Sequence, residues 1–364
     1  MILLSVSFAT VMQWIGYILV ALLCLMVMIV IHEFGHYVAG KLFHFKINEF
    51  SIGFGPALLH KQNKKTGEYF SIRAVPLGGF CAFAGEDSEE TAEGDFNSKP
   101  VWQRIIVLFA GAFFNYLSAL IVISIFFMSY GDFNPLVVDT YAFNDSAYVQ
   151  QLQEGDVITA VNGKDTYSLL EANKLQQLLA GHETVTLTVV RNGETIELEV
   201  TKAEYTHTYV DENGVEQTTQ GYGLGIGIGY EKVKLPFFQA IGHGFEFGFD
   251  LVRVTFRAIG DMFTGKAYVG DTMGGTVTAI QSLVLLTKEG FAAIIYGFCV
   301  LSMSIALFNL LPIPALDGSR IVFAIIEGIR RKPLNRKVEG MIHAVGLFAL
   351  LGLAIVLDLL HFLG

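Results

Sequence analysis

Charged residues are scarce in this sequence. Aspartate, glutamate, lysine and arginine make up 16% of its 364 residues, whereas 52% are hydrophobic. Soluble domains usually carry about 25% charged residues, which argues against an entirely soluble protein. The mean hydropathy of +0.51 instead indicates an integral membrane protein with a soluble insert. The formal net charge of -10 argues against nucleic acid as a partner, because nucleic acids bind basic surfaces.

Cysteines and N-terminal basic residues are also scarce. Cys24, Cys81 and Cys299 lie far apart, and no Cys-x-x-Cys pair is present. A disulfide framework or a cysteine metal site is therefore not expected, and each thiol is interpreted as a small apolar packing group. The N-terminus lacks the basic segment of a secretory signal, and its apolar run is longer than such a signal needs. We interpret this run as a retained membrane span.

The central motif of the chain is His32-Glu33-Phe34-Gly35-His36. On a helix, residues i and i+4 share one face, so His32 and His36 can bind the same metal ion. Glu33 lies beside them, where it can take a proton from a metal-bound water. The motif lies in a long apolar segment, where ionisable groups are functional candidates. The pattern predicts a zinc hydrolase, and the alternative is a pair of satisfied core histidines.

Four apolar segments are long enough to cross a bilayer, at about residues 16–42, 101–128, 291–311 and 338–360. Basic residues cluster after the first segment and between the last two. By the positive-inside rule, both of these loops are cytoplasmic. Both termini and the acidic insert between the second and third spans are then expected outside the cytoplasm.

A polar stretch after the first span is predicted to form a β-hairpin at the membrane interface. Residues 45–55 and 69–76 resemble strands, and a polar turn at 63–67 separates them. A free edge of this hairpin, next to the active site, would pair with an extended peptide. The alternative is a plain reversing loop, because short apolar runs are easily mistaken for strands.

The soluble insert at 131–235 is predicted to combine strands with one helix. Alternating side chains predict strands at 185–190 and 196–200, each with one buried face. A helix is expected at about 168–180, and the polar stretch 206–220 is interpreted as an extended loop. After the insert, an aromatic and amphipathic segment suits a helix that lies in the membrane interface.

A third metal ligand is needed, because a catalytic zinc takes three protein ligands and leaves one position open. Pro312, Pro314 and Gly318 interrupt the helix where the third span reaches the same side of the membrane as His32. Asp317 is the nearest acid in this break and is the predicted third ligand. The alternative is an aspartate that only caps the following helix.

Residues 152–200 resemble a PDZ domain of the circularly permuted bacterial kind, a fold that binds extended chain ends by strand addition. This insert, the intramembrane His-Glu-x-x-His and the Asn-x-x-Pro-x-Pro-x-Leu-Asp-Gly run at 309–318 together resemble the site-2 protease family of intramembrane zinc proteases. Within the family, the bacterial regulator-of-sigma-E protease group is the most similar. Its frequent Gly-Pro-x-x-Asn pattern is here Gly111-Ala112-Phe113-Phe114-Asn115.

The resemblance implies a zinc-dependent endopeptidase with one Zn2+ per chain, although the ligand types also permit another divalent ion. Its metal ligands would be His32, His36 and Asp317, with Glu33 as the catalytic base. Its substrates would be single-pass membrane proteins already trimmed by another protease, such as anti-sigma factors or signal-peptide remnants. The PDZ groove would bind a peptide or chain end, or would only filter by size. The candidate substrate-binding residues are Asn309, Asn115, Gly53, Phe54, Gly55, Pro312 and Pro314.

The predicted fold is a polytopic α-helical membrane protein of about four transmembrane helices. It carries a membrane-associated β-hairpin or sheet and an inserted extracytoplasmic α+β PDZ domain. The protein would lie in the lipid bilayer of the bacterial cytoplasmic membrane, with its active site toward the cytoplasmic side. The predicted segments are the first transmembrane helix (1–43), the re-entrant β-element and a cytoplasmic loop (44–100), the second transmembrane helix (101–130), the PDZ domain (131–232), amphipathic interfacial helices with a loop (233–288), the third transmembrane helix with the Leu-Asp-Gly motif (289–319), and a basic loop with the fourth transmembrane helix (320–364).

Two other functions fit parts of the sequence. A non-catalytic membrane scaffold would bind peptides through the PDZ domain, but it would have no need of Glu33. A transporter would need an ion path, and no paired inverted repeat is evident. Metal content separates both of these functions from the protease.

Overall fold

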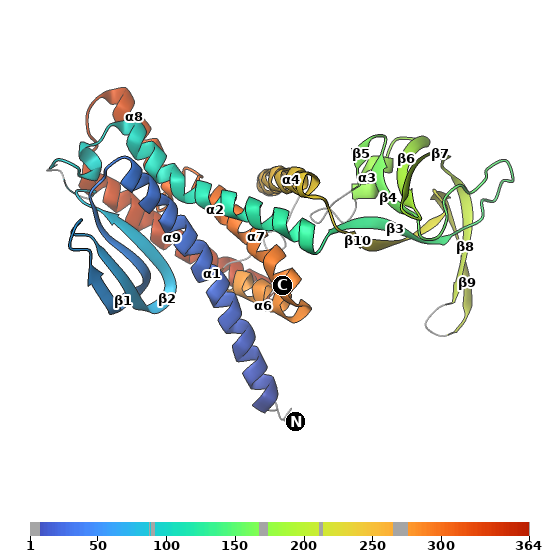
Figure 1. Cartoon of the computed structure of the whole chain (residues 1–364), viewed down its shortest axis with the longest axis horizontal. Helices are drawn as coiled ribbons and strands as arrows, with labels where there is room; N and C mark the ends of the chain where they lie inside the picture. The colour runs from blue at the N-terminus through green and yellow to red at the C-terminus, as the bar shows by residue number, and fades with distance from the viewer. Residues whose placement is uncertain are drawn as a thin grey trace. The chain divides into compact units, whose positions relative to one another are not determined.

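A computed structural model of the chain describes residues 8–86, 88, 92–166, 174–210, 214–264 and 276–363 (Figure 1). Two compact units are present. One runs from Ser124 to Phe247, and the other combines the two flanking parts of the chain. The flanking parts hold the sequence motifs of the predicted metal site, and the central unit holds most of the β-structure.

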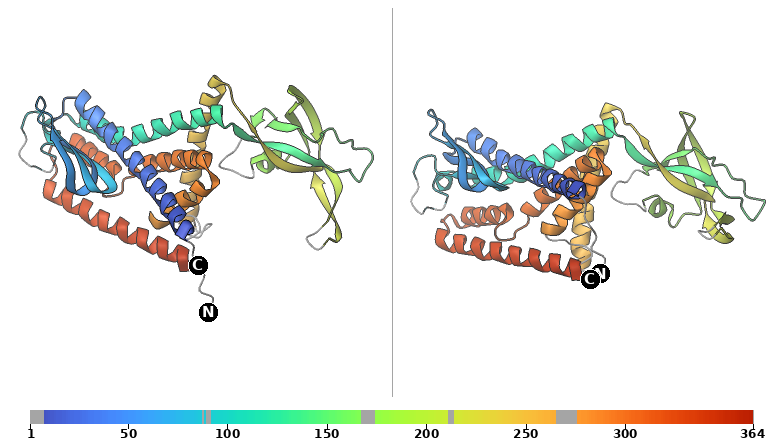
Figure 2. Two further views of the ribbon diagram at one scale, coloured as in Figure 1. Left: turned by 60° about the horizontal axis from the view of Figure 1, so that its bottom comes forward. Right: turned by 90° about the horizontal axis from the view of Figure 1, so that it is seen from below.

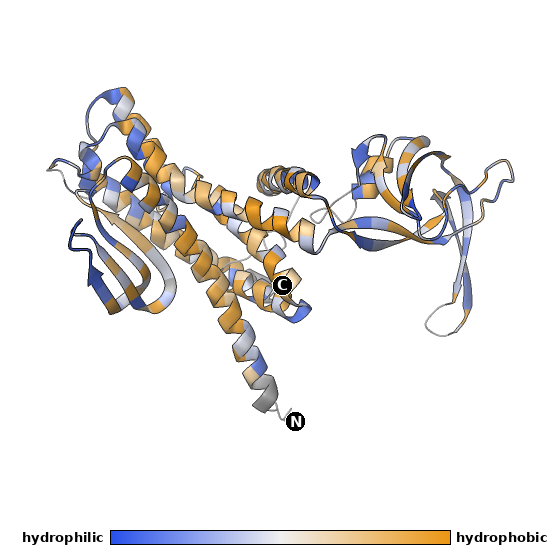
Figure 3. Cartoon of the chain, viewed as in Figure 1, coloured by the Kyte–Doolittle hydropathy of each residue, from blue (hydrophilic) through white to orange (hydrophobic). Residues whose placement is uncertain are grey.

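Four helices in the described residues are long and apolar enough to span a membrane. They are α1 (Phe8–Leu42), α2 (Val101–Ser129), α7 (Phe291–Asn309) and α9 (Arg336–Leu363). Hydrophobic residues dominate all four (Figure 3), and a helix satisfies its own backbone hydrogen bonds in a medium without water. Large apolar side chains on them face outward, such as Leu19 and Phe348, which are 60% and 73% exposed. The prediction of four apolar spanning helices is thus confirmed.

Two shorter helices contact these long ones. Helix α6 (Thr276–Glu289) packs on α1 through Ala21, Leu283 and Val284. Its first turn donates hydrogen bonds to the carboxylate of Asp358 on α9, which caps it. Helix α8 (Asp317–Arg330) lies along α9 in both views of Figure 2.

The predicted β-hairpin is present and larger than expected. Strands β1 (Ile47–Gln62) and β2 (Tyr69–Phe83) both bend. The first half of β1 therefore pairs with both halves of β2, and its second half pairs with residues 69–73. Gly53 and Gly55 have φ angles of +86° and +83°, a region that favours glycine, at the bend of β1. The alternative of a plain reversing loop is wrong.

Residues 79–83 of β2 form one edge of this small sheet. They pair with the first half of β1 on one side. On the other side they face α1, against which β2 packs (Figures 1 and 2). No strand of the described residues pairs with this outer side. The hairpin is followed by a short 3-10 helix, η1 (Phe96–Ser98), before α2 begins.

The central unit is built on a six-stranded sheet of order β10-β3-β4-β6-β7, in which β5 also pairs with β4. Its strands are β3 (Asp132–Thr140), β4 (Val157–Val161), β5 (Lys164–Asp165), β6 (Thr184–Arg191), β7 (Glu194–Thr201) and β10 (Ile226–Val233). Buried apolar residues of β4 and the alternating apolar residues of β6 form its core, which includes Ile158, Val161 and Leu187. Strands β6 and β7 confirm the two strands that alternation predicted.

Helix α3 (Lys174–Leu179) lies within the predicted helix at 168–180, whose residues 168–173 are outside the described part of the chain. Helix α4 (Phe237–Phe263) follows the sheet, and the predicted amphipathic segment is helical over these residues. Residues 265–275, which include most of the small-residue loop predicted at 270–278, are also outside the described residues.

The prediction of an extended loop at 206–220 is wrong. Residues 206–210 and 216–220 belong to a second hairpin, formed by β8 (Ala203–Val210) and β9 (Glu216–Gly223) in full register. Tyr205, His207 and Tyr209 alternate along β8 and present one face, on which Tyr141 stacks against the Tyr205 and His207 rings. Cross-strand pairs and this aromatic stack stabilise a hairpin whose side chains are mostly polar.

Candidate active site

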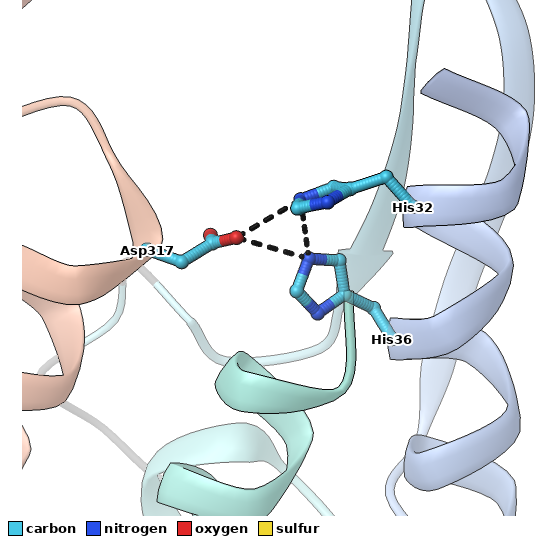
Figure 4. A group of neighbouring side chains, drawn as sticks. All are labelled: His32, His36 and Asp317. Carbon is cyan, nitrogen blue, oxygen red and sulfur yellow. Dashed lines mark hydrogen bonds and ion pairs between the residues drawn. The ribbon is translucent and has the colours of Figure 1, made fainter. Parts of the chain in front are cut away.

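Three side chains from two distant parts of the chain converge at one point (Figure 4). His32 and His36 lie one turn apart on α1, and Asp317 lies at the start of α8. The Nε2 atom of His32 is 3.2 Å from Nε2 of His36 and 2.9 Å from Oδ2 of Asp317. Nε2 of His36 is 3.4 Å from the same Oδ2 atom. Both histidines are buried, and together these residues offer three ligand atoms to one ion.

The spacing of these atoms fits a tetrahedral metal ion. Zinc lies about 2.0–2.1 Å from nitrogen or oxygen ligands, so the edge of its tetrahedron is roughly 3.3 Å. The three observed distances bracket this length. Nδ1 of His36 lies 2.8 Å from the carbonyl oxygen of Val107, which can only accept, so Nδ1 carries the proton. The lone pair of His36 Nε2 is therefore free to bind a metal.

The site depends on close packing of α1 on α2. A Cβ atom at Gly111 would lie 2.4 Å from Nε2 of His36 and 2.8 Å from Cε1 of His32. Only glycine at this position of α2 leaves room for the two imidazoles. The Gly111–Asn115 run, noted in the sequence for its missing proline, thus contributes a glycine that the site requires.

Glu33 and an edge of the β-sheet line the same cavity as the three converging side chains. The cavity has a volume of about 310 Å³. Its lining includes Glu33, the β2 residues 80–83 and the side chains of Glu86 and Arg320. Cγ of Glu33 lies 3.5 Å from where a Cβ atom of Gly79 would be, so the sheet edge passes directly beside Glu33. Three potential metal ligands, the carboxylate of Glu33 and an unpaired strand edge therefore share one cavity.

Comparison with known proteins places this chemistry in a family. The model of peptidase family M50 matches residues 20–353, which is most of the chain. The chain belongs to peptidase family M50. This result confirms the resemblance to the site-2 protease family and the prediction of a zinc metalloendopeptidase.

Bacterial relatives align along nearly the whole length of this M50 peptidase. A protein of Fusobacterium nucleatum is 33% identical over 92% of this chain and 94% of its own length. A protein of Clostridium perfringens is 32% identical over 94% of this chain and 97% of its own. Both are named "putative zinc metalloprotease". Their names agree with the donor set of two imidazoles and a carboxylate.

The other predicted site residues of the M50 peptidase lie outside the lining of this cavity. Asn115 on α2 is fully buried, and neither polar atom of its amide has a hydrogen-bond partner among the described residues. The backbone carbonyl oxygen of Asn115 accepts a hydrogen bond from the hydroxyl of Ser302 on α7. Asn309 is half-buried at the last position of α7.

The β1 bend and Pro314 contact residues other than the three potential metal ligands. Phe54 stacks on Phe80 with ring centroids 6.3 Å apart, and the carbonyl oxygen of Gly55 accepts a hydrogen bond from Arg73. Pro314 lies against Gly346 of α9. Phe54 of the bend thus contacts Phe80, which belongs to the cavity lining.

The sequence did not predict an ion-pair network around α8. Arg320 of α8 pairs with Glu86, and both side chains line the cavity. Farther along α8, Glu327 binds Arg104 of α2 at 2.5 Å and Arg336 of α9 at 2.6 Å.

Glu327 is ionised in this network. Burial opposes ionisation, but the N–H of Leu334 and the two guanidiniums hold the pKa of Glu327 below its usual range. The network fixes the helix that begins with Asp317. In the sequence, Arg320 and Arg336 are recognisable only as basic residues between the last two apolar segments, and Glu327 only as an isolated acid.

Proposed function

We propose that this M50 peptidase is an intramembrane endopeptidase that hydrolyses peptide bonds in transmembrane segments of single-pass proteins. The observation that carries the proposal is the shared cavity. Three potential zinc ligands, Glu33 and a free strand edge line it. The ligands and Glu33 belong to helices that expose large apolar side chains. A water-dependent reaction in such a place requires a polar hollow that is shielded from lipid.

In the proposed mechanism, His32, His36 and Asp317 hold the metal. When bound, zinc supplies a Lewis acid that polarises the scissile carbonyl and lowers the pKa of water. Glu33 accepts a proton from the attacking water and later delivers it to the leaving amine. The N–H of His36 Nδ1, held by the Val107 carbonyl, keeps that imidazole oriented during both steps.

The free edge at residues 79–83 is proposed to hold the substrate. A transmembrane helix has all of its backbone amides paired, so it must unwind before water can attack it. An unwound segment would pair with this edge by strand addition, beside Glu33. Gly53, Phe54 and Gly55 would shape the sheet for this purpose. The amides of Asn115 and Asn309 would form hydrogen bonds with the freed backbone groups of the substrate. Pro312 and Pro314 would also contact the substrate.

The central unit is proposed to be an extracytoplasmic PDZ domain that selects substrates. Its alternating strands and short helix are consistent with this assignment. It would admit single-pass proteins that another protease has already shortened, such as anti-sigma factors or signal-peptide remnants. The basic residues after α1 and between the end of α7 and the first turn of α9 favour an active site toward the cytoplasmic side of a bacterial inner membrane.

Cleavage of a single-pass substrate by the full chain in detergent tests this function. Wild type, Glu33→Gln and wild type with a zinc chelator are compared. We expect cleavage by wild type only, with normal zinc content in Glu33→Gln, because the glutamine cannot accept the proton. Cleavage by Glu33→Gln at the wild-type rate, with the chelator also without effect, would contradict the mechanism.

A further inference from the structure

We propose that helix α9 positions the metal ligand Asp317, through a clamp formed by His343 and Gly346. The clamp holds the turn at residues 313–316, which leads directly into Asp317. This inference rests on the proposed role of Asp317 as a zinc ligand. Neither the metal motifs nor the family match assigns a role to these two residues of α9.

His343 supports a strained part of the turn. Nδ1 of His343 lies 3.0 Å from the backbone nitrogen of Ala315 and accepts its N–H. Ala315 has a φ angle of +81°, in the left-handed region that residues with a Cβ rarely adopt. Such a conformation persists only where neighbouring contacts impose it. Ala315 precedes Asp317 by two residues, so the hydrogen bond acts next to the ligand.

Gly346 supports the same turn from one helical turn farther along α9. A Cβ atom at Gly346 would lie 2.3 Å from Cβ of Pro314 and 2.7 Å from its carbonyl oxygen. Pro314 therefore lies directly on the backbone of α9. Because residues i and i+3 share a helix face, His343 and Gly346 contact neighbouring residues of the turn from one side.

A displacement of the turn would be passed on to Asp317. The backbone N–H of Leu316 bonds to the Ile313 carbonyl, and Ser319 bonds back to the carbonyl of Leu316. At Gly318 a Cβ atom would lie 2.3 Å from the Leu310 carbonyl oxygen, so the turn and the start of α8 are tightly packed together.

Helix α9 is in turn fixed to α8. Arg336 of α9 binds Glu327 of α8 at 2.6 Å, and the ring of His343 packs edge-on against Phe323 of α8. The helix is therefore a fixed support for the turn. The distance of 2.9 Å between His32 and Asp317 depends on it, and ligands need to be held to within about 0.5 Å.

Matched variants of the full chain in detergent test the clamp. His343→Leu removes the acceptor, whereas His343→Asn keeps an acceptor at nearly the position of Nδ1. Gly346→Ala adds a Cβ against Pro314. Gly352→Ala makes the same change on the same helix, where no heavy atom of the described residues lies within 4 Å of the added Cβ. The readouts are the rate of zinc release to a chelator and the visible spectrum of the cobalt-substituted protein.

His343→Leu and Gly346→Ala are expected to release zinc about 10- to 100-fold faster, as for other residues that orient metal ligands, and to change the cobalt spectrum. His343→Asn and Gly352→Ala should match wild type in both readouts. Wild-type release and spectra for Gly346→Ala and His343→Leu would overturn the proposal. If His343→Leu does not fold, the comparison of Gly346→Ala with Gly352→Ala decides alone.

Asp317→Ala in the same series separates this inference from the proposed function. If Asp317→Ala retains zinc as tightly as wild type, the proposed ligand set is wrong and the clamp has no ligand to position. If Asp317→Ala loses zinc while the His343 and Gly346 variants keep it, the ligand set stands and only the clamp is refuted.

Discussion

Gly35 of α1 faces Ala110 of α2 so closely that a Cβ atom at Gly35 would lie 2.4 Å from the Ala110 carbonyl oxygen. The contact lies between the two histidines in the sequence and next to the bond from His36 to Val107. Gly35→Ala must therefore push α1 away from α2. We expect a 10- to 100-fold loss of zinc affinity, because the bond that orients His36 would be lost.

Competition with a chromogenic chelator measures this change in zinc affinity. Gly16→Ala is the control, because no described heavy atom lies within 4 Å of a Cβ added at that position of α1. It should bind zinc as wild type does. Equal affinities for Gly35→Ala and wild type would show that the helix contact does not position the histidines.

Replacing the buried amide of Asn115 is predicted to lower activity without lowering stability. A buried amide without partners costs about 1–3 kcal/mol, so Asn115→Leu should leave the Tm unchanged or raise it. If the amide serves the freed backbone of the substrate, kcat/KM should fall at least about tenfold, the order of one hydrogen bond in the transition state. Zinc content should stay constant.

Ser302→Ala is the matched control for Asn115→Leu. It removes the hydrogen bond to the Asn115 carbonyl and leaves the amide in place. We expect a lower Tm and retained activity, which is the opposite pattern. An Asn115→Leu enzyme that is stable and fully active would show that Asn115 only packs between helices. Thermal unfolding and cleavage assays on the same preparations make both comparisons.

Local spacing explains what the sequence predicted at the site. His32 and His36 share a helix face whatever else the chain does, and the prolines before Asp317 break a helix in any context. The contact of His343 with Ala315 has no such local signal. It depends on where α9 packs and on the positive φ angle of Ala315, which the residue type does not indicate.

The prediction at the second hairpin, β8 and β9, is wrong for a different reason. The polarity of the stretch 206–220, which has few apolar residues, favours a loop. Its strand signal lies in the alternation of Tyr205, His207 and Tyr209 with the threonines between them. The double pairing of β1 was also unpredictable, since register shifts at its bend depend on contacts with both halves of β2.

A buried ion pair in the central unit predicts how its stability depends on pH. Asp156 is fully buried and binds Arg191 at 2.7 Å. Burial opposes ionisation, but Arg191 and the N–H of Gln153 hold the pKa of Asp156 below its usual range. The pair therefore stabilises the sheet above the unfolded pKa of about 3.9. This contribution is lost as the pH falls toward the folded pKa.

Asp156→Asn is expected to cost about 3 kcal/mol at pH 7, because it leaves Arg191 partly buried without its charge partner. In the full chain, amide exchange in β4 and β6 would then be roughly 100-fold faster where global opening of the unit controls it. The difference from wild type should shrink below pH 4. Asp139→Asn, an exposed carboxylate on β3, should change exchange little. Equal exchange in Asp156→Asn and wild type would refute a stabilising pair.

The chain enters and leaves the central sheet at neighbouring points, so the proposed PDZ domain can be deleted without separating the parts that flank it. A Cβ atom at Gly131, just before β3, would lie 2.7 Å from the carbonyl carbon of Val233, the last residue of β10. The two ends are therefore adjacent, and residues 132–233 can be replaced by a short glycine linker. Deleting only residues 152–200 would instead cut β4, β6 and β7 out of the six-stranded sheet.

If the proposed PDZ domain excludes untrimmed substrates, the enzyme lacking residues 132–233 should cleave both the full-length and the shortened form of a single-pass substrate. Wild type should cleave only the shortened form. The ratio of the two cleavage rates measures this selectivity, and the rate on the shortened form is the control, because the metal site is untouched. A deletion enzyme that still cuts the shortened form and still rejects the full-length one would move substrate selection to the membrane-embedded part of the chain.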